Sequence, residues 1–326
     1  MVEIPRLVAV ETTSHCNARC PFCPHGVMAR GHGPMDDDLF AKIIEDCRAF
    51  PLPAIEPFLV GDPFSDPQIL DRLALIRRRL PKTALRLYTN GHALTPQKTD
   101  AMRGLRLDHL FISLNTLDPA RYEAVMGLRL ERTLDNLAYL LDPARRDEVA
   151  RRVSLRMTRL ADTTLAEQDA FLAYCRDKRV RPLIVGLFNY KGDVGSDLPV
   201  PRHGCEHTGR LDILADGRVT LCCMDQEGEH GWGSVRDHSV LELYRHREAR
   251  RYRDAHARGR RREVEPCASC NNFWPGFHGA RLGQQLRTAV DYGLYQLRHR
   301  PSGRRPPTSG AQAGSLIALR RRRAGE

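Results

Sequence analysis

Three cysteines lie within eight residues of one another near the start of the chain, in the stretch SHCNARCPFCPHG. Cys16, Cys20 and Cys23 form the pattern C-x3-C-x2-C, which a loop can wrap around one iron-sulfur cubane so that each thiolate binds one iron. Three ligands leave the fourth iron open. Zinc is the rival, but a structural zinc site normally has a fourth Cys or His, and the nearby His15 and His25 are poorly placed for that role.

A second group of cysteines lies between residues 205 and 270. Cys205 and Cys222 are separated by the pattern C-x11-G-x4-C, in which the glycine is Gly217, and a C-x2-C pair of Cys267 and Cys270 follows. Four thiolates from two distant pairs can close one [4Fe-4S] cluster, although C-x2-C pairs also suit tetrahedral zinc. The segment RLDILADGRVTLCC predicts a hairpin that turns at its Asp-Gly pair and carries its second strand to the cysteine.

The remaining cysteines raise one ambiguity. Spacing favours Cys222 as the metal ligand, while its neighbour Cys223 points to the opposite face of a strand, and the choice between them stays open. Cys47 and Cys175 lie in helical stretches without partner spacing, so we expect small buried hydrophobic residues there. Four histidines flank the second cysteine group and are expected in loops or on the surface: His203, His207, His230 and His238.

Length and composition indicate one sizeable catalytic domain with a smaller module. The chain has 326 residues, of which 41% are hydrophobic, and no apolar run approaches the roughly 18 residues of a membrane span. The N-terminal MVEIPRLVAV has only a four-residue apolar run, too short for a signal peptide. We therefore expect a cytoplasmic protein, and in that reducing compartment ten cysteines favour metal or redox chemistry over disulfides.

The net charge of +11 is concentrated at the C-terminal end. Residues 281–326 hold ten Arg against Asp291 and Glu326, a local charge of +8 that leaves +3 for the rest. This segment is rich in Pro, Gly and Ser and is predicted to be a largely disordered tail. A second basic run, 245–261, is expected to be a solvated helix face. Contact of the tail with nucleic acid or an anionic membrane stays open, but nucleic acid is not the expected partner.

Alternating strand-like and helix-like segments surround these motifs. Three residue pairs, Asp66-Pro67, Thr95-Pro96 and Asp118-Pro119, each put a capping side chain before a proline suited to a first helical turn. Successive strand-helix units favour a parallel sheet or partial barrel, in which ligands bind beyond the C-terminal ends of the strands. The first three cysteines follow such a strand end. The strand-like runs lie at 7–11, 58–60, 85–89, 109–115, 152–158 and 183–188.

The first motif resembles that of the radical S-adenosylmethionine (SAM) enzymes, whose cysteine loop follows the first strand and has an aromatic residue before the last cysteine, here Phe22. The resemblance implies an α/β fold, a partial (β/α)6 TIM-like barrel. It also implies a catalytic [4Fe-4S] cluster on Cys16, Cys20 and Cys23, with SAM at the open iron. An electron would cleave SAM to methionine and a 5'-deoxyadenosyl radical that abstracts hydrogen from carbon. An electron donor such as flavodoxin or ferredoxin is implied as a partner.

The same resemblance implies further cofactor residues. The stretch VGDPF stands where the family has a Gly-Gly-Glu-Pro-like motif, so Gly61 and Asp62 are expected at the SAM amino group. Asp62 is one methylene shorter than the usual Glu, and its contact is direct, through water or absent. Arg156 could reach the cofactor carboxylate or substrate, or serve as a structural ion-pair partner. Two later strand ends place three more residues near the cofactor: Asn90, Ser113 and Asn115.

The second motif resembles the Twitch form of the SPASM-type auxiliary domains. This implies one auxiliary [4Fe-4S] cluster, and so two clusters in all, with the second on Cys205, Cys222, Cys267 and Cys270. The full seven-cysteine SPASM pattern would need further cysteines after Cys270, and the sequence has none. The domains expected are a radical SAM barrel over 1–200, an auxiliary module over 201–280 and the basic tail over 281–326.

The short stretch before the first strand, the single Twitch-like cluster and PCASCNN (266–272) together most resemble the 2-deoxy-scyllo-inosamine dehydrogenase branch. That resemblance implies a small-molecule substrate, such as a sugar, aminocyclitol or nucleotide-like compound. The auxiliary cluster would accept an electron in a two-electron oxidation. A redox-neutral epimerase, decarboxylase or carbon-carbon bond-forming enzyme of natural-product biosynthesis stays open, as does a peptide-modifying SPASM maturase. The non-enzymatic alternative is a zinc-stabilised nucleic-acid-binding protein.

Overall fold

The protein is represented by a computed structural model that describes residues 3–196, 200–201, 204–272 and 290. Apart from Val290, the predicted basic tail lies outside these described residues. Any contact between that tail and nucleic acid or a membrane therefore stays a prediction.

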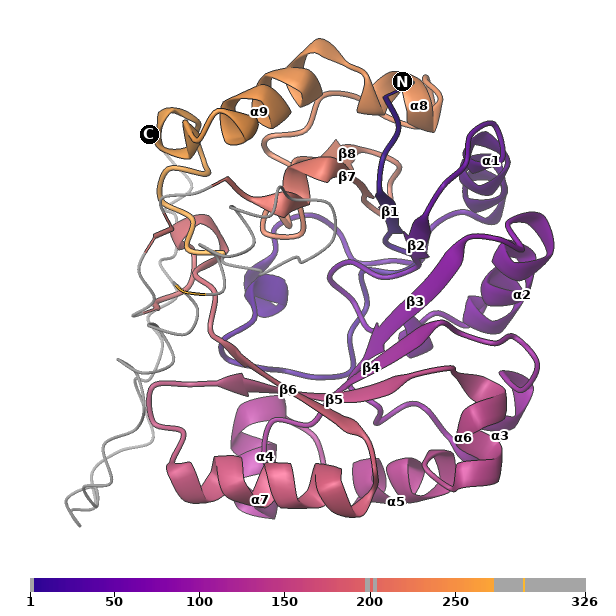
Figure 1. The fold of residues 1–326 in the computed structure, drawn as a ribbon, viewed down its shortest axis with the longest axis vertical. Coiled ribbons are helices and arrows are strands. Elements are labelled where there is room, and N and C mark those ends of the chain that lie inside the picture. The colour runs from indigo at the N-terminus through magenta and orange to yellow at the C-terminus, as the bar shows by residue number, and fades with distance from the viewer. Residues whose placement is uncertain (1–2, 197–199, 202–203, 273–289, 291–326) are drawn as a thin grey trace.

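Strands from both halves of the chain join in one curved sheet (Figure 1). The strand order is β6-β5-β4-β3-β2-β1-β7-β8. All neighbouring pairs are parallel except β7 and β8, which form an antiparallel hairpin. The strands are β1 (Leu7–Val10), β2 (Ala54–Glu56), β3 (Ala84–Thr89), β4 (His109–Ser113), β5 (Val153–Arg159), β6 (Arg181–Gly186), β7 (Arg210–Ile213) and β8 (Val219–Thr220).

This arrangement confirms the predicted α/β partial barrel. Five of the six predicted strands overlap observed ones, but the prediction of a strand at 58–60 was wrong. The second strand ends at Glu56 instead, because the next residue is Pro57, which has no N–H to donate to a ladder. Phe58 then donates its backbone N–H to the Glu56 carbonyl at 2.8 Å, which bends the chain away from the sheet.

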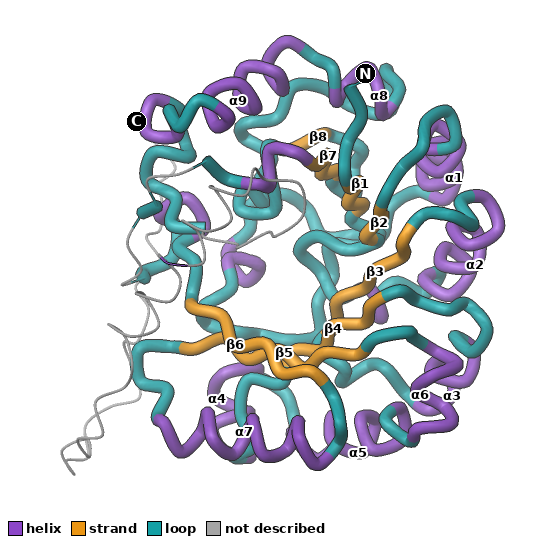
Figure 2. The backbone as a smooth tube through the Cα atoms, viewed as in Figure 1, coloured by secondary structure: helices purple, strands orange, loops and turns teal. Residues whose placement is uncertain are grey.

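Most helices lie along the outer side of the arc of strands (Figure 2). Thr95 and Asp118 cap α3 and α4 as predicted, but Asp66 does not cap α2, which begins after Gln68. Within the described ranges, every helix is too short or too polar to span a bilayer. The helices are α1 (Asp37–Cys47), α2 (Ile69–Arg79), α3 (Pro96–Ala101), α4 (Pro119–Met126), α5 (Leu130–Leu140), α6 (Pro143–Val149), α7 (Leu165–Asp177), α8 (Val240–Tyr244) and α9 (Arg247–Ala257).

The two faces of the sheet differ in polarity. On β3, Leu85 and Leu87 are fully buried in the main hydrophobic core, while Arg86 and Tyr88 alternate with them and face the other side. On that inner face Glu56 Oε1 lies 3.8 Å from Arg86 Nη1 on β3, and Glu56 Oε2 lies 3.4 Å from Arg210 Nη2 on β7. This face therefore combines charged groups with stacked aromatic rings, since Tyr88 stacks on Phe111 with ring centroids 4.3 Å apart.

The predicted hairpin forms and extends the barrel sheet. Gly217 has φ +93° in its turn, a conformation that favours glycine. Strand β7 pairs with β1 over four residues, from Leu7 opposite Arg210 to Val10 opposite Ile213. The module that carries the later cysteines is therefore attached to the barrel through backbone hydrogen bonds, although the proposed domain boundaries themselves stay a prediction.

Candidate active site

The first cysteine loop follows β1 directly and holds three half-buried thiols. Burial raises the pKa of Cys16 to about 12, and the nearby Asp62 carboxylate raises it further. The pKa values of Cys20 and Cys23 are raised by burial as well. These thiols would be neutral alone, whereas a bound metal centre would supply the positive charge that stabilises thiolates. The donor set fits the three-thiolate iron-sulfur site that the sequence predicts.

The end of α4 supports this loop. Arg19 donates its backbone N–H to the Met126 carbonyl at 2.8 Å, and Cys20 Sγ lies 3.6 Å from Met126 Sδ. Within the loop, the Cys23 N–H bonds to the Cys20 carbonyl at 3.0 Å. The positions of the cysteines are thus fixed by backbone contacts from a helix far along the chain.

Gly61 and Asp62 connect the end of the second strand to the cysteine loop. A Cβ on Gly61 would lie 2.4 Å from the Thr13 carbonyl oxygen and 2.5 Å from that of His15. The Asp62 carboxylate is 2% exposed. It accepts hydrogen bonds from the backbone of Phe64 (2.9 Å) and Asn90 (2.7 Å) and from the Thr89 hydroxyl.

These contacts give both residues a structural task beside the predicted cofactor role. Protein donors already engage both Asp62 carboxylate oxygens, so a contact with the SAM amino group would have to share them. The contact between Asp62 and SAM therefore stays a prediction. Gly61 allows two backbone segments to approach more closely than any side chain would permit.

Replacing Gly61 with alanine is expected to displace the loop that carries Cys16 and to lower the iron content of the first site. The methyl group meets two backbone oxygens, which cannot rotate away as a side chain would. The measurement is iron and sulfide per chain after anaerobic reconstitution. Gly26→Ala is the matched control. It lies in the cysteine loop itself, and a Cβ there would meet nothing within 4 Å. Equal iron in both variants would contradict this account.

The other predicted cofactor residues fall into two groups. Asn90 donates to Asn17 of the cysteine loop at 2.7 Å, and Ser113 lies directly opposite Arg156 on the neighbouring strand. The buried Arg156 Nε has no hydrogen-bond partner among the described residues, so its contact with a cofactor or substrate stays a prediction.

The side chains of two other predicted cofactor residues instead contact other parts of the protein. Asn115 accepts from the Thr158 N–H at 2.8 Å and donates toward Met126 Sδ at 2.8 Å. Phe22 is 8% exposed and belongs to the main core. Their cofactor roles stay predictions, and their contacts here fix the shape of the site.

The second group of cysteines comes together from three separate segments. Cys222 packs against two hydrophobic clusters, one that contains Cys267 and one that contains Cys270. The pKa of Cys222 is raised well above its usual value by burial and then by neighbouring thiols, first that of Cys223 and then those of Cys270, Cys205 and Cys267. The four predicted ligands are thus neighbours, and the donor set fits an auxiliary iron-sulfur cluster.

Cys223 has a different environment. Its thiol lies 3.7 Å from His207 Nδ1, and its pKa is raised mainly by burial, with smaller effects from Arg210 and Asp212 of β7 and from Cys205. Burial lowers the pKa of His207 to about 3, so this imidazole is neutral. Cys222 borders the clusters of both Cys267 and Cys270, whereas Cys223 borders only that of Cys270, which favours Cys222, and the assignment stays a prediction.

Arg261 supports the second cysteine group, a role the sequence analysis missed. It lies in the basic run expected to be solvated, yet it is 1% exposed. Its guanidinium donates to three carbonyls of the C-x2-C loop: those of Cys267 (3.1 Å), Asn272 (3.2 Å) and Cys270. Most of its neighbours in the run, such as Arg247, are exposed as expected. No periodicity distinguishes the buried arginine from the exposed ones.

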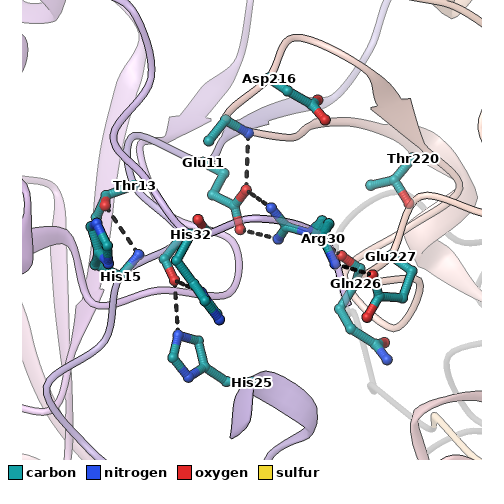
Figure 3. Close-up of polar contacts among 12 residues, drawn as sticks. Glu11, Thr13, His15, His25, Arg30, His32, Asp216, Thr220, Gln226 and Glu227 are labelled. Atoms are coloured by element: carbon teal, nitrogen blue, oxygen red, sulfur yellow. Dashed lines mark hydrogen bonds and ion pairs between the residues drawn. The ribbon is translucent and has the colours of Figure 1, made fainter. Parts of the chain in front are cut away.

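A second missed residue, Arg30, joins the first cysteine loop to the auxiliary module (Figure 3). It forms two hydrogen bonds with the buried Glu11 carboxylate, at 2.8 and 2.6 Å, and its Nε donates to the Gln226 carbonyl at 2.5 Å. Its backbone N–H donates to the Glu227 carboxylate at 3.1 Å. Glu11 also accepts from the Ala215 N–H at 2.9 Å. These contacts fasten the loop between β1 and the later hairpin.

The family comparisons agree with this geometry. Residues 10–149 match the radical SAM superfamily model, and residues 205–271 match the SPASM iron-sulfur cluster-binding domain. The chain therefore contains a radical SAM domain followed by a SPASM domain.

Similar proteins include a curated relative from Pyrococcus furiosus, the tungsten-containing aldehyde ferredoxin oxidoreductase cofactor-modifying protein. It is 34% identical over 109 residues, which cover 33% of this chain and 30% of the relative. The match thus spans less than a third of that relative's length.

Two solved structures share the fold. BtrN, in complex with AdoMet and 2-DOIA, has a TM-score of 0.60 at 17% identity, covering 83% of this chain and 95% of BtrN. SuiB of Streptococcus suis, bound to the precursor peptide SuiA, has a TM-score of 0.63 at 13% identity, covering 82% of this chain and 70% of SuiB. At these identities the likeness concerns the fold.

Proposed function

We propose that this radical SAM enzyme is an oxidoreductase that holds two [4Fe-4S] clusters and removes two hydrogens from a small polar substrate, such as an aminocyclitol, sugar or nucleotide-like compound. When bound, the first cluster and SAM supply a 5'-deoxyadenosyl radical that takes one hydrogen atom from carbon. The observation that carries the proposal is the group of four neighbouring cysteines in the second module. Four protein thiolates leave no iron open, which suits an electron acceptor.

The residues of the chain divide the remaining work. Cys16, Cys20 and Cys23 would hold the first cluster. Arg156, whose Nε has no hydrogen-bond partner among the described residues, would contact SAM or substrate. An auxiliary cluster held by the later cysteines would accept one electron from the substrate radical, and a base would take one proton. The substrate is then oxidised by two electrons, and SAM is consumed.

The substrate class and partners extend this proposal. BtrN is bound to 2-DOIA in its structure and is covered over 95% of its length, which supports a small molecule. A reduced carrier such as flavodoxin or ferredoxin would deliver the electron for SAM cleavage. The cytoplasm, where thiolates and such carriers stay reduced, is the compartment we assign.

The test is anaerobic turnover of candidate aminocyclitols, sugars and nucleotides in deuterated buffer, followed by mass spectrometry. We expect one 5'-deoxyadenosine, one methionine and one product two hydrogens lighter per turnover. Cys267→Ala should suppress product more than it suppresses SAM cleavage, because the first cluster remains while the electron exit is lost. A zinc-only preparation that turns over would refute the cluster assignment.

The environment of Cys223 favours a second candidate, a redox-neutral reaction. Its thiol lies beside the neutral His207, and it could return a hydrogen atom to a substrate radical. The same assay separates the two reactions. A redox-neutral enzyme would give a product of unchanged mass that carries one deuterium, and Cys223→Ala would abolish this product. That result would contradict the proposed dehydrogenase activity. A peptide substrate would instead follow the precedent of SuiB with SuiA.

A further inference from the structure

Helix α9 and the loop after it form a basic surface on the outside of the second module (Figure 1). Residues 245–263 hold nine arginines against three carboxylates. A surface hollow of about 550 Å³ lies on this segment, with room for several side chains of a partner. Two carboxylates line this arginine hollow, Asp254 and Glu263, together with five arginines, which are Arg247, Arg250, Arg251, Arg258 and Arg260.

The arginines of this hollow are exposed and have only weak partners within the chain. The Arg247 side chain is 92% exposed, and its Nε lies 3.7 Å from Glu248. Arg251 shares that carboxylate at 3.0 Å, and Arg260 lies 3.5 Å from Glu263. Exposed ion pairs of this kind contribute little to stability, so the guanidinium groups can exchange them for the carboxylates of another molecule.

Two apolar residues connect the arginine hollow to the auxiliary cysteines. Ala255 and Val264 line the hollow, and both are buried in the hydrophobic cluster that contains Cys267. Tyr252 of α9 belongs to the same cluster, and Cys222 packs against it. Residues that border the hollow thus pack in the cluster that contains a predicted ligand, so a molecule bound in the hollow would lie beside the second cysteine group.

The charges and the position of the hollow favour an acidic protein over a nucleic acid. Asp254 and Glu263 lie among the arginines and would repel a phosphate backbone, whereas a protein can place hydrogen-bond donors opposite them. Guanidinium groups also pair with carboxylates through two parallel hydrogen bonds. The nearby auxiliary cysteines would give a redox protein, but not a nucleic acid, a reason to bind at this place.

We infer that the arginine hollow on α9 is the docking site of an acidic one-electron carrier protein that exchanges electrons with the second module. The inference rests on the proposed oxidation, in which each substrate leaves one electron in that module. The oxidised carrier would take up this electron and become reduced by one electron, and no bond forms or breaks in the transfer.

The test measures binding and needs no turnover. Full-length reconstituted protein is titrated with an oxidised, acidic [2Fe-2S] ferredoxin by anaerobic calorimetry. In the triple variant Arg247→Gln, Arg251→Gln, Arg258→Gln we expect the dissociation constant to rise about tenfold at low salt, because three contacts with carboxylates lose their cations. High salt should reduce this difference, since it screens exposed charges. Arg250 stays native, because it also pairs with Glu3 at 3.0 Å.

A matched control removes the same charge from another part of the surface. The triple variant Arg48→Gln, Arg78→Gln, Arg79→Gln changes three exposed arginines at the C-terminal ends of α1 and α2, and it should keep the native dissociation constant. Equal weakening in both triple variants would show that net charge alone attracts the ferredoxin. That result, or no binding of ferredoxin by the native protein, would overturn the inference.

Two further measurements separate the remaining explanations. A short single-stranded DNA that binds the native protein and not the hollow variant, while both bind the ferredoxin equally, would assign the hollow to nucleic acid and overturn the inference. The proposed function fails on a different result, which is the absence of a product two hydrogens lighter from the native protein. Ferredoxin binding is measured without substrate, so that failure would leave the binding result unchanged.

Discussion

Replacing Arg261 with methionine is expected to leave the protein with about half of its iron and sulfide, because the C-x2-C loop loses the buried group that organises it. The guanidinium donates to the carbonyls of Cys267, Cys270 and Asn272, and it is 1% exposed. Hydrogen bonds from a charged donor contribute about 1.5–3 kcal/mol. Methionine fills much of the volume but leaves three acceptors without this donor.

The first cluster should survive this change, since its ligands lie in the loop after β1. SAM cleavage should therefore continue while the yield of oxidised product falls. Iron, sulfide and product are measured on the same anaerobic preparation. Arg262→Met is the control, because Arg262 is exposed and directly follows Arg261. A full iron complement in Arg261→Met would show that the cluster loop folds without the guanidinium.

The second large effect is expected from Arg30→Met, which leaves the fully buried Glu11 carboxylate without its cation. Breaking one partner of a buried ion pair typically costs about 3–5 kcal/mol. The predicted result is a lower midpoint of urea unfolding with little change in slope. The loop that carries the first cysteines should loosen as well, since Arg30 also bonds to Gln226.

A pair of comparisons isolates the charge effect. Arg48→Met removes an exposed partner of Glu45, with side chains 46% and 56% exposed, and should cost less than about 1 kcal/mol. The double variant Arg30→Met, Glu11→Leu should regain part of the lost stability, because no unpaired charge remains. Equal unfolding midpoints for Arg30→Met and Arg48→Met would remove the special role of the Arg30 pair.

Local patterns were sufficient to predict most of the architecture. Alternating apolar residues on β3, and the capping residues Thr95 and Asp118, report on structure through their immediate neighbours. The hairpin at Gly217 follows from its turn pair in the same way. The strand expected at 58–60 failed because hydrophobicity was given more weight than Pro57, which removes a ladder donor.

The missed residues share a different property, since their roles arise from long-range contacts. Arg261 looks like its solvated neighbours until the chain folds back around it. Tyr190 and Lys191 take positive φ in the turn after β6 without a glycine or asparagine signature, and the contacts that hold this turn, from Asn189 to Asn271 and from Lys191 to Asp225, reach far along the chain. Arg30 is likewise understood only through the buried Glu11.

Strand β7 pairs in parallel with β1, so the second module covers an edge of the sheet that would otherwise be open. A chain ended at residue 200 would leave the N–H and C=O groups of β1 that face β7 without partners, and the sequence of β1 is the wholly apolar LVAV. Such a bare, hydrophobic edge strand is a template for pairing with another molecule. The barrel half is therefore expected to self-associate when made alone, so deleting the later residues cannot serve as a clean way to remove the auxiliary cluster.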